Sequence, residues 1–486
     1  MRVVVFTTLA PERLAPWHEV IRQTQGVSAV MIVRLSPGGA APEGLQDFGS
    51  LLVDVRAWHA DCGLAIGVPS LPPVFHTLPA RGTLGVRMGH GPVTPDEPPG
   101  FWEMWSGADR IVAEVDWLGL ERAGVGAVGA APVYPHDTPA SLGARAEELG
   151  RLLVSAALRA IAEGKPLSGR RTRPAEAAAQ PTPPQRLAMW SRVLANLAKR
   201  WLGPLTLGKL AGTMAWLALV RPARDAVRTL RRRHPVRIYT LHRVTRLCRD
   251  GMTVSPSVFR RQLEYLRRHH DVVTLDAAIA LIARGARLRR PVAAITFDDG
   301  YASVAQSAVP IMESLGVVGA VFVCPRIVDE RGRFAHDEHN PARPWMTVMD
   351  WGAIRRLRDA GWHVGSHGST HVRLSTLTGE PLLQELRDAR IALRERIGVE
   401  HMAFAYPFGG ERDITPEGIE TARWCGYSAL LSDFGGENLP DRSDRFALRR
   451  IDIGGDHDTL MWKAMIHAMD LKRLRQLAGR RNGRPA

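Results

Sequence analysis

Two short segments of the sequence carry side chains that can bind a metal ion or move a proton. Asp298 and Asp299 end the apolar run VAAITFDDG, and His367 and His371 follow a second apolar run in WHVGSHGSTH. Carboxylates at the end of a buried strand are costly unless a cation compensates them, so the pair indicates a site. Two imidazoles and one carboxylate would form a three-ligand site with open positions, as in catalytic zinc centres. The second carboxylate would then be free to act as a base.

The histidine segment offers two pairs, because His363 lies four residues before His367. If His363 belongs to a strand, the two are about 13 Å apart at about 3.3 Å per residue, too far to share one metal ion. His367 and His371 instead flank Gly-Ser-Thr, which can curl and bring both rings together. Each segment alone is weak evidence, because Asp-Gly is a common turn and roughly 0.6 such histidine pairs arise by chance.

The elements around these segments alternate between strands and helices from about Val236 to Asp470. Apolar positions spaced by three and four predict helices around Phe259, Leu263 and Leu266, and again from Leu382 to Ile397. Such alternation predicts a parallel sheet, open or closed into a barrel, with its chemistry at the carboxyl ends of the strands. The predicted strands are Arg237–Leu241, Val292–Phe297, Ala320–Val323, Trp362–Gly365, Met402–Tyr406 and Tyr427–Leu431.

Four motifs in this region, taken together and in order, resemble those of the NodB-type polysaccharide deacetylases. They are YTLHRV at 239–244, TFDDG at 296–300, SHGSTH at 366–371 and FAYPFGG at 404–410. The resemblance implies a distorted (β/α)7-type barrel that removes acetyl groups from carbohydrates with one divalent metal ion. It implies that Asp299, His367 and His371 are the metal ligands, with Zn²⁺ preferred and Co²⁺, Ni²⁺ or Mn²⁺ as alternatives, and that Asp298 is the base.

The resemblance also assigns roles to the motif at 404–410. The backbone N–H of Phe408 would help to hold the oxyanion, and Tyr406, Pro407 and Phe408 would bind substrate. This chemistry is reasonable, because a bound metal ion lowers the pKa of its water to about 7 and polarises the carbonyl. The metal and the backbone N–H would together stabilise the tetrahedral oxyanion.

The sequence departs from the family at two places. Ala405 stands where many members have an arginine that orients the base, although the subgroup with the poly-N-acetylglucosamine deacetylases resembles this variant. The late leucine-x-histidine motif that supplies a general acid is not evident, and the corresponding stretch reads ALRRIDIGGDHD. His457 is therefore the candidate general acid, and Asp298 is expected to lack its orienting arginine.

Residues 1–165 are predicted to form a separate α/β domain, with strands at Arg2–Phe6, Ala29–Val33 and Ser50–Val55 and a helix at Ser141–Glu163. The segments at 81–109 and 132–153 resemble the Rossmann-like N-terminal domain of folate-dependent formyltransferases, a family that relies on Asn-x-His and a later Asp. Met88 takes the place of the Asn, His90 remains, and Glu121 is the best match to the Asp. A methionine cannot donate the amide's hydrogen bond, so we expect a degenerate domain that serves recognition or scaffolding.

Residues 166–235 are predicted to be a linker and connector. The first part is rich in Pro and Ala, and the apolar run at 201–220 is interrupted by Pro204 and Lys209. Residues 186–249 contain fifteen basic side chains and Asp225 as the only acid. The run is thus either a helix lying on an anionic membrane or a helix packed on the folded domains, and its two basic flanks disfavour a true span.

The overall composition restricts the class of protein. The chain has 486 residues and a net charge of +15, and the basic side chains gather at 186–249 and in the tail at 471–486. This local basicity argues against nucleic-acid binding. Four cysteines without Cys-x-x-Cys spacing indicate a reducing compartment, and no signal peptide is evident, so a cytoplasmic location is expected, peripheral on the inner face of the membrane.

These observations predict a metal-dependent hydrolase that removes an N-acyl group, with N-acetyl preferred, from a carbohydrate. Lipid-linked sugars are among the expected substrates. Two alternatives remain open from the sequence: an N-deformylase or bifunctional N-acyl sugar-modifying enzyme, and an inactive carbohydrate-binding barrel.

Overall fold

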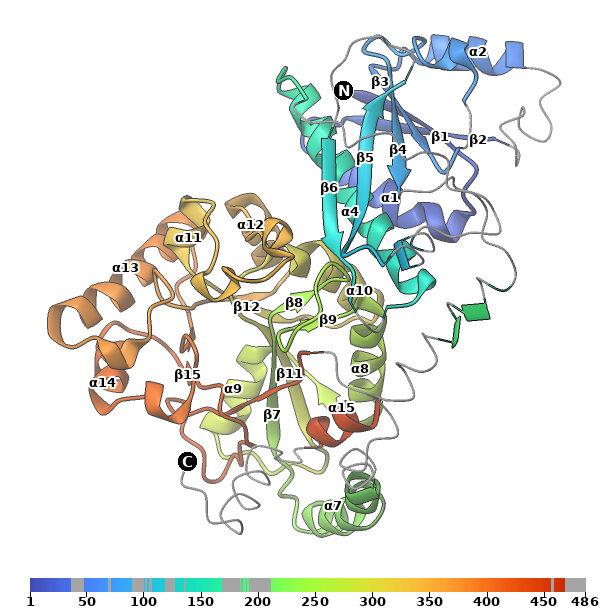
Figure 1. Ribbon diagram of the computed structural model, residues 1–486. Coiled ribbons are helices and arrows are strands. Elements are labelled where there is room, and N and C mark those ends of the chain that lie inside the picture. The colour runs from blue at the N-terminus through green and yellow to red at the C-terminus, as the bar shows by residue number, and fades with distance from the viewer. Residues whose placement is uncertain are drawn as a thin grey trace. The chain divides into compact units, whose positions relative to one another are not determined.

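The computed structural model describes residues 1–35, 48–68, 71–89, 100, 103–104, 107–118, 127–134, 137–167, 184, 187–188, 190–191, 211–455 and 459–467. The chain divides into two compact units, Met1–Trp201 and Leu202–Ala486, and each combines helices with one main sheet (Figure 1). The mixed α/β class predicted from the sequence is confirmed. The finer boundaries at 165, 235 and 470 stay predictions.

The first unit contains a six-stranded sheet in the order β2-β1-β3-β4-β5-β6. The first four strands in this order are parallel, whereas β5 and β6 join antiparallel. The strands are β1 (Arg2–Thr7), β2 (Ala29–Arg34), β3 (Cys62–Ile66), β4 (Thr83–Met88), β5 (Arg110–Trp117) and β6 (Ala127–Pro132). The helices are α1 (Pro11–Gln23), α2 (Phe48–Ala57) and α4 (Pro139–Ala162).

One predicted strand of this unit is wrong, because Ser50–Val55 lies inside the helix α2. Val55 is buried, and with Leu52, three residues before it, it belongs to the apolar cluster around Phe6 and Phe75. That spacing of three matches one face of a helix, so the tertiary contact selects the helical period over the strand.

The second unit is built on a parallel sheet in the order β15-β14-β13-β12-β11-β7-β16, with β10 beside β11. Leu448, just before β16, forms a parallel bridge with Leu431 of β15, so backbone hydrogen bonds connect the two outer strands of this order. The strands are β7 (Val236–Leu241), β10 (Asp271–Val272), β11 (Val292–Phe297), β12 (Ala320–Val323), β13 (His363–Ser366), β14 (Phe404–Ala405), β15 (Leu430–Leu431) and β16 (Arg450–Asp452), with the short pair β8 (Arg243–Val244) and β9 (Thr253–Val254) outside this sheet.

The two faces of this sheet bury different side chains, because successive residues of a strand point to opposite sides. One face, with Tyr239, Ile295 and Phe404, packs against the large apolar side chains of the surrounding helices. The main helices are α8 (Pro256–His269), α9 (Leu275–Ala283), α10 (Val309–Ser314), α11 (Pro325–Asp329), α12 (Trp351–Asp359), α13 (Gly379–Ile397), α14 (Pro416–Trp424) and α15 (Thr459–Ile466).

The other face of the sheet buries a smaller apolar cluster, in which Ala294, Ala320 and Ala405 lie beside larger side chains such as Ile238 and Phe322.

Among the described residues, no helix combines the length and the hydrophobicity that crossing a bilayer requires. The connector helix α7 (Arg221–Leu230) follows a π-helical turn, η2 (Trp216–Val220). Residues 199–210 lie outside the described residues, so the first half of the apolar run is not part of this finding.

Candidate active site

The carboxyl ends of β11 and β13 bring the predicted residues together. β11 ends at Phe297, so Asp298 and Asp299 begin the loop above it, and β13 ends at Ser366, so His367 begins the next loop. One ligand atom each from Asp299, His367 and His371 lies within 4.8 Å of the other two. The local sequence therefore places a carboxylate and two imidazoles at the same edge of the sheet.

The geometry of these three side chains fits a divalent cation. The Nε2 atoms of His371 and His367 lie 3.3 and 3.5 Å from Oδ1 of Asp299. Both carboxylate oxygens of Asp299 are buried, and neither has a hydrogen-bond partner among the described residues. Buried, unpartnered oxygens beside two imidazole nitrogens are a donor set that a cation such as zinc completes.

His367 is oriented by the backbone of a neighbouring strand. Its Nδ1 lies 2.8 Å from the carbonyl oxygen of Ala405 and donates to it, which leaves the lone pair of Nε2 facing Asp299. Burial lowers the pKa of His367 to about 4, so the ring is neutral at neutral pH. A neutral ring with this tautomer is the form that ligates metal ions.

The loop between the two histidines is held by Glu385 of α13. The carboxylate of Glu385 accepts hydrogen bonds from the backbone N–H of Thr370 at 2.8 Å and from its hydroxyl at 3.0 Å. Gly368 has a φ of +77°, and a Cβ there would lie 2.7 Å from an oxygen of Glu385. Gly-Ser-Thr can thus curl as the sequence predicted, and the curl brings His371 back toward Asp299.

Three of the predicted site residues have backbone conformations that residues other than glycine rarely adopt. The φ values are +67° for Asp299, +62° for His371 and +63° for Phe408. A left-handed conformation costs roughly 1 to 2 kcal/mol per residue, and such strain tends to gather at functional sites. Its concentration in these three loops supports a functional role for them.

Asp298 is paired with an arginine, contrary to the expectation from Ala405. Nη1 and Nη2 of Arg450 lie 2.6 Å from Oδ1 and Oδ2 of Asp298, and both side chains are buried. Arg450 begins β16 and lies opposite Ile238 of β7, so it projects to the same face of the sheet as Ile238, where it lies over the Phe322 ring. The arginine that Ala405 cannot provide therefore comes from a different strand, β16.

This pairing sets the charge of Asp298. Burial alone would raise the pKa of Asp298, but the Arg450 guanidinium, with a smaller contribution from His367, holds it below its ordinary value. For Asp299, burial also opposes ionisation, and His371 with His242 and His367 outweighs it, so its pKa is lowered as well. Both carboxyls are therefore ionised at neutral pH.

His242 is a site residue that the sequence reasoning missed, although its motif had been singled out. Leu241 pairs in register with Phe297, so His242 and Asp298 are the next residues of adjacent strands. His242 is close enough to Asp298, Asp299 and Asp433 to lower the pKa of each carboxyl. Its Nδ1 is buried and has no hydrogen-bond partner among the described residues.

Two more titratable side chains lie at the same site. Burial and the neighbouring Asp452 raise the pKa of Asp433 to about 7. His336, from the segment between β12 and α12, places Nε2 3.6 Å from Oδ2 of Asp299 and 3.0 Å from the hydroxyl of Tyr301. Neither belongs to a motif whose spacing points to chemistry, so only the folded chain reveals them.

The three residues predicted to bind substrate differ in their exposure. The Phe408 ring is 46% exposed, lies 5.0 Å from the ring of His371 and is covered on one side by Arg373 at 4.2 Å. Pro407 is buried, and Tyr406 packs edge-to-face against Phe404 in the core. Among these three, only Phe408 offers a ring that a ligand can reach.

Of the remaining candidate residues, the structure describes only His363 and Met88. His363 lies in β13, where Nδ1 is 2.9 Å from Asp276, so it is not part of the candidate metal site. His457, the candidate acid, lies outside the described residues, as do His90 and Glu121 of the first unit. Met88 ends β4 and is buried.

Comparison with known proteins identifies a family in the second unit. Residues 285–430 match the family model of the polysaccharide deacetylases. The second unit contains a polysaccharide deacetylase domain. The matched segment includes Asp298, Asp299, His367, His371 and Phe408, whereas His242 and Arg450 lie outside it on opposite sides.

Individual proteins resemble the two parts of the chain. The deacetylase domain is similar to the Bacillus subtilis (strain 168) protein named "Putative polysaccharide deacetylase YxkH", with 19% identity over 258 residues, 53% of this chain and 81% of that protein. It is also similar in structure to the Streptococcus pyogenes deacetylase PplD, with a TM-score of 0.41 and 15% identity over 49% of this chain and 99% of PplD. Another solved structure that matches the chain is a phosphoribosylglycinamide formyltransferase from Brucella melitensis, with a TM-score of 0.29 and 17% identity over 35% of this chain and 98% of that chain.

Proposed function

We propose that the deacetylase domain hydrolyses an N-acetyl group on a carbohydrate with the help of one divalent metal ion. The observation that carries this proposal is that two adjacent carboxylates have different partners. Asp299 faces two imidazoles, and Asp298 faces an arginine. The first is arranged to bind a cation, and the second is held ionised next to it. Amide hydrolysis needs these two functions side by side.

Asp299, His367 and His371 would hold the metal ion, and their two nitrogens and one oxygen favour zinc over harder cations. Such an ion would make water nucleophilic at neutral pH and polarise the acyl carbonyl. Co²⁺, Ni²⁺ and Mn²⁺ are further candidates for this set of donors.

Asp298 would accept the proton of the attacking water. It is ionised because of Arg450, and Arg450 engages both carboxylate oxygens, which fixes the plane of the carboxyl group. On the other side of the reacting carbon, the backbone N–H of Phe408 would donate to the developing oxyanion. The left-handed conformation of Phe408 is the local feature that would aim this N–H.

We assign the general acid to His242. The amine leaving group of an amide must receive a proton, and an imidazole beside the reacting groups can deliver one. His242 follows the strand that pairs with the strand leading to Asp298, and it lies near enough to Asp433 to lower the pKa of that carboxyl. An acid and a base from neighbouring strand ends would thus act on the same bond.

Replacing His242 by alanine tests this role, because only substrates whose leaving group needs a proton should be affected. Hydrolysis of an N-acetyl sugar should fall by about 10²- to 10⁴-fold, because the amine departs unprotonated. Hydrolysis of p-nitrophenyl acetate should change little, because nitrophenolate needs no proton. The kinetics of both substrates and the metal content would be measured, with His401→Ala, an exposed histidine before β14, as the control. An equal loss on both substrates would assign His242 another role.

Release of acetate tests the proposed function itself. The purified protein, loaded with Zn²⁺ or Co²⁺, should release acetate from N-acetylglucosamine oligomers, and a chelator should abolish the release reversibly. The same assay would measure formate from N-formyl sugars, because formate release alone would identify an N-deformylase. Sugar binding without any release, despite bound metal, would instead identify a carbohydrate-binding domain.

The exposed Phe408 ring supports a carbohydrate substrate, since sugar rings pack their apolar faces on aromatic side chains. Lipid-linked sugars remain among the proposed substrates. A cytoplasmic location, peripheral to a membrane, also remains a proposal, as does a recognition or scaffolding role for residues 1–165.

A further inference from the structure

Helix α7 and the turn η2 are inverted relative to an ordinary surface helix, because their apolar side faces solvent. The exposed fractions are 72% for Leu219, 52% for Val220, 50% for Val227 and 86% for Leu230. Surface helices normally bury such residues and expose their charges. Here the charged side is the buried one: the side chains of Arg221, Arg224 and Arg228 are only 23%, 24% and 19% exposed.

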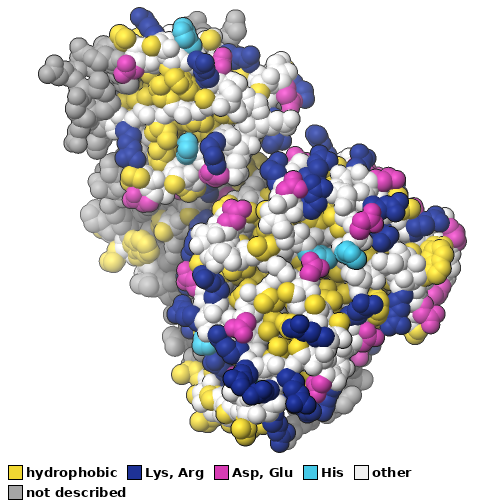
Figure 2. Space-filling view, turned by 180° about the vertical axis from the view of Figure 1, so that it is seen from behind, with side chains coloured by type: hydrophobic (Ala, Val, Ile, Leu, Met, Phe, Trp, Pro, Cys, Tyr) yellow, Lys and Arg dark blue, Asp and Glu magenta, His cyan; other side chains and the backbone are white. Residues whose placement is uncertain are grey.

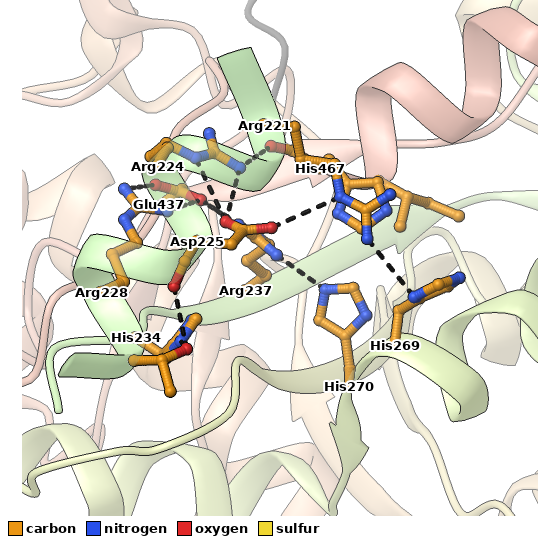
Figure 3. Close-up of polar contacts among 12 residues, drawn as sticks. Arg221, Arg224, Asp225, Arg228, His234, Arg237, His269, His270, Glu437 and His467 are labelled. Atoms are coloured by element: carbon orange, nitrogen blue, oxygen red, sulfur yellow. Dashed lines mark hydrogen bonds and ion pairs between the residues drawn. The ribbon is translucent and has the colours of Figure 1, made fainter. Parts of the chain in front are cut away.

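An ion-pair network holds this charged side on the deacetylase domain (Figure 3). Arg228 of α7 and Arg237 of β7 both bind the carboxylate of Glu437, with nitrogen–oxygen distances of 2.6 and 2.5 Å. Arg224 donates to the carbonyl oxygen of His467 at 2.9 Å. Burial opposes the ionisation of Glu437, but the two arginines lower its pKa to about 2, so the network stays charged.

The histidines around the network are neutral at neutral pH, so they do not repel the arginines. Burial and the neighbouring arginines lower the pKa of His467 to about 2 and that of His270 well below its ordinary value. His269, whose Nδ1 lies 3.4 Å from Arg221, also has a lowered pKa because of burial. Neutral rings can accept hydrogen bonds from guanidinium groups, so α7 is anchored firmly by its polar side.

The outward side of α7 therefore has a fixed composition: an apolar stripe with basic residues at its end. Arg231, Arg232 and Arg233 follow Leu230 directly and are all exposed. Arg233 lies 3.4 Å from Asp441, whereas no ion pair of Arg231 or Arg232 is found among the described residues. Figure 2 shows hydrophobic and basic side chains gathered together at the lower end of this unit, where Figure 1 places α7.

An anionic lipid surface fits this composition, because the apolar stripe can enter the boundary of the acyl chains while arginines meet acidic headgroups. A nucleic acid would contact the arginines but would not bury the apolar stripe. An apolar protein interface would bury the stripe but would not require arginines without acidic partners. We propose that α7 docks this protein on an anionic bilayer through its exposed apolar side. Its inward side, with Arg221, Arg224 and Arg228, holds the helix on the deacetylase domain.

The position of α7 also orients the active site. α7 leads directly into the beginning of β7, whereas His242 and the metal-binding loops follow the carboxyl ends of β7, β11 and β13. The six residues of β7 span about 20 Å at about 3.3 Å per residue. A domain docked through α7 thus presents its candidate active site at the end away from the bilayer, and this consequence, unlike docking itself, rests on the proposed function. The expected substrate is then a soluble carbohydrate or a lipid-linked chain that extends away from the bilayer, rather than a sugar at headgroup level.

Vesicle binding of the full-length protein tests the docking. Binding to vesicles of phosphatidylcholine with phosphatidylglycerol should exceed binding to phosphatidylcholine alone and should weaken at high salt. The double variant Val227→Glu/Leu230→Glu should bind more than about tenfold less tightly, because both apolar side chains leave the lipid. Trp424→Glu, which removes an exposed apolar side chain from α14, should bind as the parent does. Acetate release from soluble oligomers would be measured for all variants and should stay unchanged.

Two outcomes would overturn the docking. Equal vesicle binding by the double variant and the parent would exclude α7 as the contact. A parent that ignores anionic vesicles but sediments as a dimer, and becomes a monomer in the double variant, would make this face a protein interface. Neither outcome depends on whether the domain hydrolyses the chosen sugar.

A polarity-sensitive fluorophore tests the orientation. In a Cys425→Ser background, a label at Val227→Cys should shift to the blue on anionic vesicles, whereas a label at the exposed Glu411→Cys, in the loop after Phe408, should not. Blue shifts at both positions would show that the candidate active site faces the bilayer and would overturn the proposed orientation.

Discussion

The Asp298→Asn variant should lose about 10²- to 10⁴-fold in deacetylation while it keeps its metal ion. Asparagine has nearly the same shape as aspartate but cannot accept the proton of the attacking water, and general-base catalysis commonly contributes about 10²- to 10⁴-fold. The proposed ligand atoms come from Asp299, His367 and His371, so the substitution should leave the metal site unchanged. Acetate release and elemental analysis of the same preparation would be compared.

The control for this variant is Asp276→Asn. Asp276 also contacts a histidine of the sheet, His363, but it lies at the start of α9 and outside the site. Its replacement should leave turnover within a small factor of the parent. An Asp298→Asn enzyme with parental turnover and full metal content would require another base, whereas loss of the metal would identify Asp298 as a ligand.

Loss of the Arg450 side chain should both inactivate and destabilise the domain. In Arg450→Met, the carboxylate of Asp298 remains buried without its cation, and breaking a buried pair in this way costs about 3 to 5 kcal/mol. Thermal or urea unfolding would measure this loss. In the double variant Asp298→Asn/Arg450→Met, no unpaired charge remains, so much of the stability should return while activity stays lost. A single variant as stable as the parent would contradict the pairing.

The same substitution should change the pH dependence of the activity. In the parent, Arg450 lowers the pKa of Asp298, so the base is ionised well into the acid range. Without Arg450, burial raises that pKa, and Asp298 becomes protonated, and therefore inactive, as the pH falls through a higher value. The acid limb of the pH–rate profile should thus move to higher pH in any residual activity of Arg450→Met. Arg450→Lys, which retains the charge but not the two-point contact, should shift it less.

The ligand cluster could be predicted from the sequence because its parts are local. Asp298 and Asp299 are adjacent, His367 and His371 are separated by a segment that can curl, and each pair follows an apolar run that reads as a strand. Parallel strands end at the same edge of a sheet, so two such runs predict one site. The alternation of strands and helices in the second unit is similarly local, whereas Ser50–Val55 shows that a short apolar run alone does not distinguish strand from helix.

The side chains that contact this cluster, Arg450 and His242, could not be predicted, because they depend on the order of strands in the sheet. A local sequence pattern does not specify that order. β16 lies beside β7, so Arg450 reaches Asp298 across 152 positions of sequence. His242 lies beside Asp298 for the same reason, because β7 pairs with β11. For the connector, the sequence showed an apolar run with basic flanks, which fits a helix on a membrane as well as a helix packed on the folded domains. The buried carboxylate of Glu437 decided which side turned inward, because charge in a low-dielectric interior is stable only beside its opposite.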